Sequence, residues 1–460
     1  MKIIEVSGYP KTLVRNTVGA GRYRRGRQDK DLFLHPPSPE EIARRQIEGF
    51  NRTWAHALML PFYQKIAAER DLPTAITGLD ELDAWPVITK DVLRAHEELL
   101  WDGMDRSRAY TTSGSTSTPF SFPADDRDFA PRYSAMWSYR AAAGLAPFDG
   151  FAAFHDIHPG SVTSRVGIQA NLLKQRLKDT LNNSWMFEPL PTDESELDEQ
   201  LLRLTRKRPE YLVGRTYSLN RLARRAHETG ILRKADYTPR YTILTSERIT
   251  EEDVRIVAEG FDTQVLSEYG SVELGVIAAS LPDQTWPMRV IWHYTILRAD
   301  PEGNALVTTI AERGFPLINY QLGDTIEPEL TGPGGTVLEL GPVKGRLVDI
   351  LTLPDSDDVH HTYEGWSLAE AVLELPDVHA VQLVEHEDSV TILVVAPGID
   401  ERRYRRRAAE SVQSTYPELK EGSVQLALID EMIPSTRGKK LLMVPEHNVD
   451  LDSLNVASLN

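Results

Sequence analysis

The 460-residue sequence contains no cysteine. This absence excludes disulfides, zinc–thiolate sites and a cysteine nucleophile. It also suits a reducing cytoplasm, which is the location we expect. Hydrophobic residues make up 41% of the chain and charged residues 26%, values typical of a soluble globular protein. A chain of this length exceeds one ordinary core, so we expect two to three domains.

Positive charge is scarce. Lysine and arginine number 51 against 68 acidic residues, which gives a formal net charge of −17. Such a chain binds polyanions poorly in general, so we expect no nucleic-acid partner. Basic residues still cluster at Arg22–Arg27 and at Arg402–Arg407. We interpret the first cluster as a solvated face and leave the role of the second open.

Long apolar runs are also missing. No stretch approaches the ~20 residues that span a bilayer, and the first residues lack the apolar core of a signal peptide. We therefore expect no association with a membrane. No internal repeat is visible, and no stretch is low enough in complexity to demand disorder.

The apolar pattern predicts an α/β architecture. Residues 1–38 are basic and weakly patterned, which predicts an arm or a peripheral element, whereas Ser38-Pro39-Glu40-Glu41 has the features of a helix start. From about Gly150 strand-like runs alternate with amphipathic helices, which favours parallel strands. Examples are the strand-like segments 211–213 and 241–244 and the helical segment 218–229.

Two later changes of pattern predict the domain organisation. Between Trp286 and Leu340 short strands with Gly and Pro turns replace the helices, which predicts a small β-rich subdomain. Beyond Gly345 the order is two strands in 379–395, a helix in 400–415 and a strand in 424–429. We therefore expect a large N-terminal domain of α/β subdomains over 1–345 and a small α+β C-terminal domain over 346–460.

Residues 110–119 read Tyr-Thr-Thr-Ser-Gly-Ser-Thr-Ser-Thr-Pro, and we call this segment the hydroxyl loop. Backbone N–H groups in such a loop can form an anion-binding nest, and Ser or Thr hydroxyls add donors for phosphate oxygens. The loop lacks the Gly-Lys-Ser/Thr ending of an ordinary P-loop NTPase. Taken alone, the same composition is also that of a plain surface turn.

Further segments accompany the hydroxyl loop in a fixed order. The sequence reads Trp85-Pro86-Val87-Ile88-Thr89-Lys90 before it, and after it Thr245-Ser246-Glu247, Ser267-Glu268-Tyr269-Gly270-Ser271-Val272-Glu273, Phe315 to Asp324, Gly345-Arg346 and Pro434 to Lys439. In order and separation these segments resemble the adenylate-forming (acyl-activating) superfamily, especially its phenylacetate–CoA ligase-like branch. The resemblance runs from about Tyr63 to Pro445.

The resemblance implies a site for ATP and Mg²⁺. It assigns the triphosphate to the hydroxyl loop, adenine stacking to Tyr269, a ribose contact to Asp324, and a contact with ribose or phosphate to Arg346. The full set implied for the nucleotide is Ser113, Gly114, Ser115, Thr116, Ser117, Glu247, Tyr269, Gly270, Ser271, Asp324 and Arg346. Glu273 is implied as a magnesium ligand, because Mg²⁺ prefers oxygen ligands.

Lys439 is the implied catalytic residue, carried on a loop of a small, mobile C-terminal domain. When a carboxylate attacks the α-phosphorus two anions approach each other, and a bridging ammonium lowers that barrier electrostatically. Lys440 is adjacent, but the Gly-Lys order favours Lys439. For the acid we name His155, His158 and Ser267 as pocket residues, with ordinary loop histidines as the alternative. The two histidines and Asp156 have the spacing of a metal site, but no supporting ligands follow.

The chain departs from the family at several positions. Ser117 stands where the family usually has Gly, Val272 replaces a Thr, and Val348 occupies the expected hinge position with Asp349 beside it. We expect adenylation of a small carboxylic acid, aryl or arylacetic, followed by transfer to CoA. Transfer to an amine or a carrier protein is the alternative, and a nucleotide-binding homologue without catalysis is a third. The Arg402–Arg407 cluster could meet CoA phosphates, an acidic carrier protein or neither, and a homodimer is left open.

Overall fold

The computed structural model describes residues 20–106, 109–111, 120–146, 149–154, 183–187, 194–343, 345–346, 350–373, 375, 378, 380–396, 400–433 and 442–459. The chain divides into two compact units. The first unit holds the described residues up to Val343 except Gly323–Thr325, and the second unit holds those three residues and the chain from 345 onward. We describe each unit by itself.

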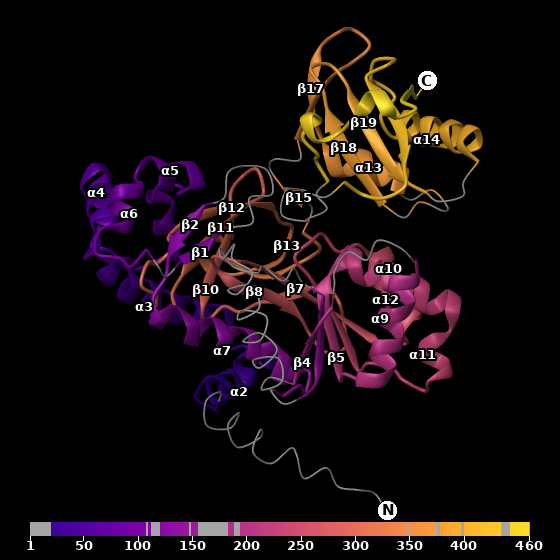
Figure 1. The fold of residues 1–460 in the computed structure, drawn as a ribbon. Helices are drawn as coiled ribbons and strands as arrows, with labels where there is room; N and C mark the ends of the chain where they lie inside the picture. The colour runs from indigo at the N-terminus through magenta and orange to yellow at the C-terminus, as the bar shows by residue number, and fades with distance from the viewer. Residues whose placement is uncertain are drawn as a thin grey trace, which may run out of the picture. The chain divides into compact units, whose positions relative to one another are not determined.

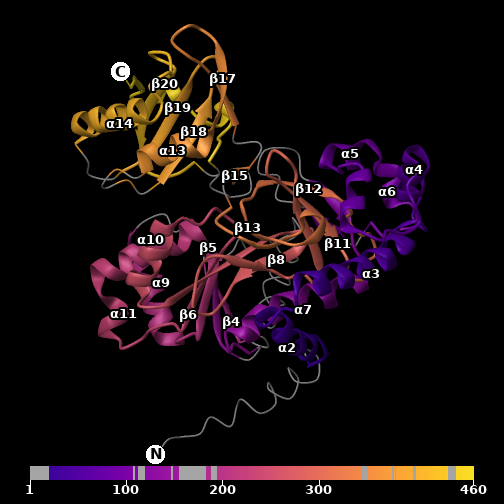
Figure 2. The ribbon, with the colours of Figure 1, turned by 180° about the vertical axis from the view of Figure 1, so that it is seen from behind.

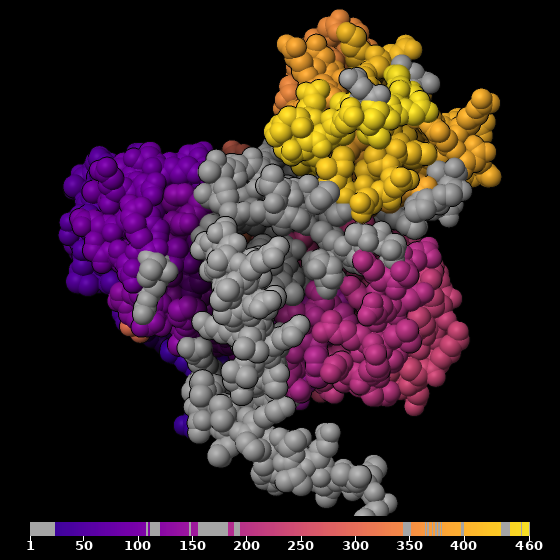
Figure 3. Space-filling model, in the orientation of Figure 1, coloured from indigo at the N-terminus to yellow at the C-terminus, as the bar shows by residue number. Residues whose placement is uncertain are grey.

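The first unit begins with helices. They are α2 (Ala20–Leu34), α3 (Pro39–Ala57), α4 (Pro61–Arg70), the 3-10 helix η2 (Leu79–Ala84), α5 (Lys90–Ala95) and α6 (Glu97–Trp101). Helix α3 starts as its sequence predicts, because the Ser38 hydroxyl accepts a hydrogen bond from the Glu41 N–H at 3.4 Å. Figure 3 shows α4–α6 and the later helices α9–α12 forming two separate parts of the surface.

Of the two alternatives expected for residues 1–38, an arm or a peripheral element, the arm is wrong for residues 20–34. These residues form α2, whose Phe33 is fully buried and contacts the Tyr139 ring at 6.5 Å between centroids. The Tyr294 hydroxyl donates to Asp29 on the same helix at 2.6 Å. Both ribbon views place α2 beside α7 (Asp126–Ala142) (Figures 1 and 2). Too few apolar residues mark this helix for a periodicity argument to find it.

A nine-stranded sheet forms the centre of the first unit. Its strands are β3 (Phe151–Phe154), β4 (Ser184–Met186), β5 (Tyr211–Arg215), β6 (Tyr241–Thr245), β7 (Gln264–Ser271), β8 (Gly275–Ser280), β9 (Met288–Val290), β13 (Pro328–Thr331) and β14 (Val337–Leu340), in the order β13-β14-β9-β8-β7-β6-β5-β3-β4. The pairs joining β4, β3, β5, β6 and β7 are parallel. The prediction of parallel strands is therefore confirmed, and the antiparallel strands extend the sheet beyond β7.

Helices cover both faces of the parallel part. The connections α9 (Glu194–Lys207), α10 (Thr216–Thr229), α11 (Ile231–Lys234) and α12 (Glu251–Phe261) pack against alternate residues such as Leu212 and Leu244. The intervening residues, such as Val213 and Ile243, pack against α7 and α2 on the other face. This alternation follows from the two-residue period of a strand. All five residues of β5 and of β6 are consequently buried.

The predicted β-rich stretch from Trp286 to Leu340 does consist of short strands. Besides β9, β13 and β14 it contains β10 (Thr295–Ala299), β11 (Asn304–Thr309) and β12 (Tyr320–Thr325). The last three belong to a second sheet of order β10-β11-β12-β15, where β15 is Gly345–Arg346. A short hairpin, β1 (Ala109–Thr111) with β2 (Ser121–Pro123), flanks the hydroxyl loop.

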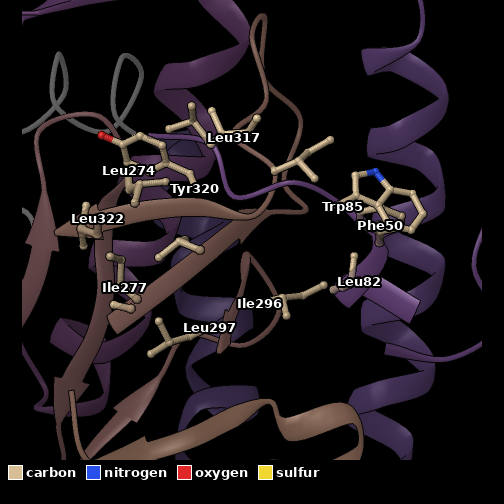
Figure 4. Close-up of a cluster of buried hydrophobic side chains, with 14 of the residues drawn as sticks. Phe50, Leu82, Trp85, Leu274, Ile277, Ile296, Leu297, Leu317, Tyr320 and Leu322 are labelled. Atoms are coloured by element: carbon tan, nitrogen blue, oxygen red, sulfur yellow. The ribbon is translucent and has the colours of Figure 1, made fainter. Parts of the chain in front are cut away.

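A large apolar cluster joins the N-terminal helices to this second sheet. It contains Phe50, Leu82 and Trp85 from the helical part and Ile296, Leu297 and Leu317 from the β-rich part. Tyr320 belongs to the same cluster, and Figure 4 shows its ring on the side of Leu274 and Leu322, away from Phe50 and Trp85. Tyr320 is fully buried, so its hydroxyl needs a hydrogen-bond partner inside the protein.

The second unit is a small α+β structure. It contains the hairpin β16 (Ile350–Pro354) with β17 (His360–Glu364), helices α13 (Gly365–Leu373) and α14 (Glu401–Thr415), and a sheet of order β18-β19-β20-β21. That sheet comprises β18 (Ala380–Glu385), β19 (Val390–Val395), β20 (Val424–Ile429) and β21 (Ala457–Ser458). The strands expected in 379–395 and 424–429 and the helix expected in 400–415 are thus present. Within the described ranges no helix is both long and apolar enough to cross a bilayer.

Candidate active site

The carboxyl ends of four parallel strands, β3, β5, β6 and β7, lie at one edge of the nine-stranded sheet. In open α/β sheets ligands bind outside this edge. Strand β7 ends here in a tight hairpin with β8, and the hairpin carries Tyr269, Gly270, Ser271 and Glu273. The fold therefore brings the expected adenine and magnesium residues to the edge where a ligand site is expected.

Gly270 is required by the hairpin itself. A Cβ at this position would lie 2.2 Å from the carbonyl oxygen of Gly275, a separation that no side chain tolerates. The pairing of β7 with β8 shifts register between Tyr269 and Gly270, so the strands approach closely at this point. The resemblance assigns Gly270 to the nucleotide site, but the close contact between β7 and β8 is sufficient to explain why this position needs a glycine.

Glu273 is a buried carboxylate in the turn between β7 and β8. It is only 3% exposed, and its Oε1 accepts a hydrogen bond from the Tyr320 hydroxyl at 3.0 Å. The Lys90 ammonium, on the first residue of α5, lies 4.0 Å from the same oxygen. Tyr320 begins the strand that carries Asp324. Three segments that are distant in the sequence thus meet at one carboxylate.

A second buried carboxylate lies close to Glu273. Asp128, on the first turn of α7, is fully buried and pairs with Arg313 at 2.9 Å. The same carboxylate accepts hydrogen bonds from the Asp125 N–H at 2.8 Å and the Gly314 N–H at 3.3 Å. Arg313 also donates to the backbone oxygen of Glu273 at 2.8 Å. The Asp128–Arg313 pair therefore ties the start of α7 to the β7–β8 hairpin.

Sequence reasoning missed Asp128, Arg313 and the ion-pair role of Lys90. The hydrogen bond from Arg313 to Asp128 joins residues 185 positions apart, so no local spacing reveals it. The available signal was Asp125 followed by Asp128, a capping box at the start of α7. That pattern predicts a helix start and gives no indication of a buried ion pair.

Glu247 and Ser267 each take part in a hydrogen bond that supports the local fold. The Glu247 carboxylate accepts a hydrogen bond from the Tyr217 N–H in the first turn of α10 at 2.9 Å, which satisfies one of the free donors of a helix start. Ser267 is fully buried, and its N–H donates to the Ser280 hydroxyl at 2.8 Å. Among the residues that the structure describes, none is a hydrogen-bond partner of the Ser267 hydroxyl. Their assignments to nucleotide and acid stay predictions.

Glu268 faces a polar network on the α7 side of the sheet. Its carboxylate lies 3.3 Å from Arg140, which is almost fully buried, and accepts hydrogen bonds from the hydroxyls of Tyr139 and Thr245. Burial raises the pKa of Tyr139, and the Glu268 charge adds to the increase. The network satisfies a buried acid and a buried base together, as a buried ion pair requires.

Asp324 and Arg346 are brought together by strand pairing. Strand β12 pairs antiparallel with β15, and Asp324 is directly opposite Arg346. Asp324 itself is partly buried. The spacing in sequence could not predict this register, but the resemblance had assigned both residues to the nucleotide.

Several predicted residues lie outside the described ranges. They are the hydroxyl-loop residues Ser113, Gly114, Ser115, Thr116 and Ser117, the histidines His155 and His158, the hinge candidates Val348 and Asp349, and the catalytic candidate Lys439. In the Arg402–Arg407 cluster, Arg402, Arg403 and Arg406 are exposed on α14, whereas Arg405 pairs with Glu401 at 2.7 Å.

The described residues contain no group of three or more His, Asp or Glu side chains arranged to hold a metal ion. Glu273 offers one carboxylate, and Tyr320 already donates to one of its oxygens. Mg²⁺ is commonly bound through one or two carboxylates together with substrate phosphates and several waters. Glu273 fits that mode and does not fit a site built from protein ligands alone.

No protein-family model matches this sequence, and no curated protein does. Solved structures do match its fold. A 2-hydroxyisobutyryl-CoA ligase in the postadenylation state, in complex with R3-HIB-AMP, covers 89% of this chain and 90% of its own, with a TM-score of 0.64 and 16% identity. The chain has the fold of this acyl-CoA ligase.

Two further structures show the same relation at lower similarity. The 2-hydroxyisobutyryl-CoA ligase with 2-HIB-AMP and CoA in the thioesterification state has a TM-score of 0.50 at 16% identity, covering 89% of this chain and 91% of its own. An anthranilate CoA ligase in complex with anthranoyl-AMP has a TM-score of 0.50 at 14% identity, covering 72% of this chain and 65% of its own. At such identities the likeness establishes the mixed α/β fold of these CoA ligases and leaves the reaction to be argued from the site.

Proposed function

We propose that this protein is an ATP-dependent ligase that adenylates a carboxylic acid, releases pyrophosphate and transfers the acyl group to CoA. The proposal rests on one observation, the hydrogen bond from the Tyr320 hydroxyl to Glu273 at the carboxyl edge of the parallel strands. Tyr320 and Asp324 lie on one strand, and Tyr269 and Glu273 lie on one hairpin. The hairpin that carries the residues assigned to adenine and metal is thus joined to Tyr320 by a direct hydrogen bond.

The structures of similar fold support the same chemistry. The 2-hydroxyisobutyryl-CoA ligase structures contain an acyl-AMP, and one of them contains CoA as well. The identity of the carboxylic acid substrate is a more specific part of the proposal. We favour an aryl or arylacetic acid because of the resemblance to the phenylacetate–CoA ligase-like branch, and the anthranoyl-AMP complex shows that this fold can hold an aromatic acyl group.

The roles of the individual residues follow from their chemistry. Mg²⁺ bound at Glu273 would neutralise phosphate charge, and Asp324 would accept hydrogen bonds from the ribose hydroxyls. Arg346, opposite Asp324, would use its planar fork on the ribose or on phosphate oxygens. The Lys439 ammonium would bridge the acid carboxylate and the α-phosphate oxygens as they approach.

Pyrophosphate release against a panel of aliphatic, aryl and arylacetic acids tests the proposal, with and without CoA. We expect release with at least one acid and an acyl-CoA product when CoA is present. No release with any acid would refute the ligase. Pyrophosphate release that does not depend on CoA and gives no acyl-CoA would favour transfer to an amine or a carrier protein. The exposed arginines of α14 could then contact an acidic carrier protein.

The catalytic lysine has a matched control in the adjacent residue. Lys439→Ala should reduce pyrophosphate release by at least about 100-fold, because electrostatic groups aimed at developing charge contribute factors of this size. Lys440→Ala removes the same charge one position away and should leave the rate within about threefold. Equal effects of the two substitutions, or an unchanged rate in Lys439→Ala, would contradict the assignment.

A further inference from the structure

Within the part of the chain that the structure describes, three buried hydrogen-bond donors around Arg313 have no partner. They are one terminal nitrogen of Arg132 (Nη1), one terminal nitrogen of Arg313 (Nη1) and the Tyr110 hydroxyl. A buried donor left unsatisfied costs about 1–3 kcal/mol, and more when it is charged. Buried polar groups in native proteins are therefore nearly always paired. Three such donors in one place indicate a missing partner that accepts hydrogen bonds.

The three donors belong to one cluster. The Arg132 guanidinium stacks on the Tyr110 ring, with Cζ 4.1 Å from the ring centroid. Arg313 is only 5% exposed, and its positive charge acts on both Arg132 and Tyr110. Arg132 lies on α7, Tyr110 on β1 and Arg313 between β11 and β12. Elements from three parts of the first unit therefore converge here.

The missing partner must carry negative charge. Arg132, Arg313 and Lys90 place three cations around the two buried carboxylates Asp128 and Glu273. Burial lowers the pKa of Arg132, and the neighbouring charge of Arg313 lowers it further, whereas Tyr110 opposes the change. Because the charge of Arg313 acts on Arg132, the two guanidinium groups repel each other, and burial strengthens that repulsion. An anion between them would remove the repulsion and accept from both forks at once.

The position of the cluster identifies the class of anion. Tyr110 lies on β1, the strand that leads into the hydroxyl loop, and Arg313 donates to the backbone of Glu273. The loop and Glu273 are the segments assigned to triphosphate and magnesium. Guanidinium forks match the geometry of phosphate oxygens.

We propose that Arg132, Arg313 and Tyr110 form a phosphate subsite that binds the β- and γ-phosphates of ATP and retains pyrophosphate after adenylation. This rests on the proposed function for the identity of the phosphate group, but the anion site itself stands on the three unpartnered donors.

Calorimetric titration of the full-length protein with inorganic pyrophosphate, inorganic phosphate, AMP and CoA tests the subsite. Arg132→Gln should weaken pyrophosphate binding by at least about tenfold, the value of one charged hydrogen bond, and leave AMP and CoA within about twofold. Arg127→Gln is the matched control, because Arg127 lies on the same helix but forms an exposed pair with Asp125. It should change none of the four affinities.

Three results would overturn the subsite. These are unchanged pyrophosphate affinity in Arg132→Gln, an equal loss for AMP, and a loss confined to CoA. A crystal structure of the wild type with pyrophosphate decides the matter if the variant fails to fold. We expect phosphate oxygens within about 3 Å of Nη1 of both arginines, and pyrophosphate bound elsewhere or not at all refutes the proposal.

If no acid supports pyrophosphate release, the proposed ligase fails. Arg132-dependent binding of pyrophosphate would still establish the anion subsite. The two proposals can therefore fail separately.

Discussion

Replacing Asp128 by Asn should destabilise the first unit more than any surface substitution of the same kind. Asp128 is fully buried, and Arg313 beside it is 5% exposed. Asn keeps the shape and one acceptor oxygen but removes the charge, so Arg313 remains buried without its ion-pair partner. Two unit charges about 4 Å apart interact by about 4 kcal/mol at an effective dielectric of 20. Breaking a buried pair from one side costs about 3–5 kcal/mol, so we expect that loss.

Urea unfolding followed by tryptophan fluorescence measures this loss in the relevant unit, because seven of the eight tryptophans precede residue 345. The control is Asp91→Asn, which breaks the exposed pair between Asp91 and Arg94 and should cost less than about 1 kcal/mol. A loss below about 1 kcal/mol for Asp128→Asn, or equal losses for both variants, would refute the reasoning. The double variant Asp128→Asn with Arg313→Met should lose less than the sum of the two single changes.

Three further predictions concern single buried groups. Burial lowers the pKa of His293 to about 3, below the value near 6.5 of the unfolded chain. As the pH falls, His293 is therefore protonated in the unfolded chain before it is protonated in the folded protein. The free energy of unfolding should consequently drop by about 2 kcal/mol between pH 7.5 and pH 5. Urea titrations at both pH values should show this drop shrinking in His293→Phe, and an identical drop would contradict it. Tyr320→Phe removes the donor to Glu273 and should cost about 1–3 kcal/mol in the same assay; no change would show that the bond contributes nothing. Gly270→Ala would place a Cβ against the Gly275 carbonyl and should lower the melting temperature by several degrees, because overpacking costs about 1–3 kcal/mol; an unchanged melting temperature would refute the close contact.

Much of the fold could be predicted from local patterns. The β5 and β6 strands and the α14 helix follow the period of their apolar residues, and the parallel pairing follows from helices placed between strands. Helix α2 escaped prediction because its basic residues hide a few buried positions such as Phe33. The order β13-β14-β9-β8 at one end of the sheet joins strands through long-range pairing, which no local pattern specifies.

The candidate site also contains residues that the sequence indicates and residues that only the structure brings to notice. Resemblance identified Glu273 and Asp324 because each lies in a compact segment with a recognisable order of residues. Arg132 and Arg313 lie in segments without such an order, and their importance comes from burial and missing partners, which exist only in three dimensions. Gly270 is the converse case. The sequence marks the glycine as a site residue, but the structure explains the need for glycine by the close contact with the Gly275 carbonyl.

The three-way contact of Asp128 with Asp125, Arg313 and Gly314 has a consequence for building chimeras of this protein. A recombinant that takes α7 from this protein and the segment between β11 and β12 from a parent without the charge pair would inherit half of a buried charge pair. Such crossovers should yield insoluble protein even when both parents share the fold. Breakpoints that keep residues 125–128 and 313–314 from the same parent should preserve solubility.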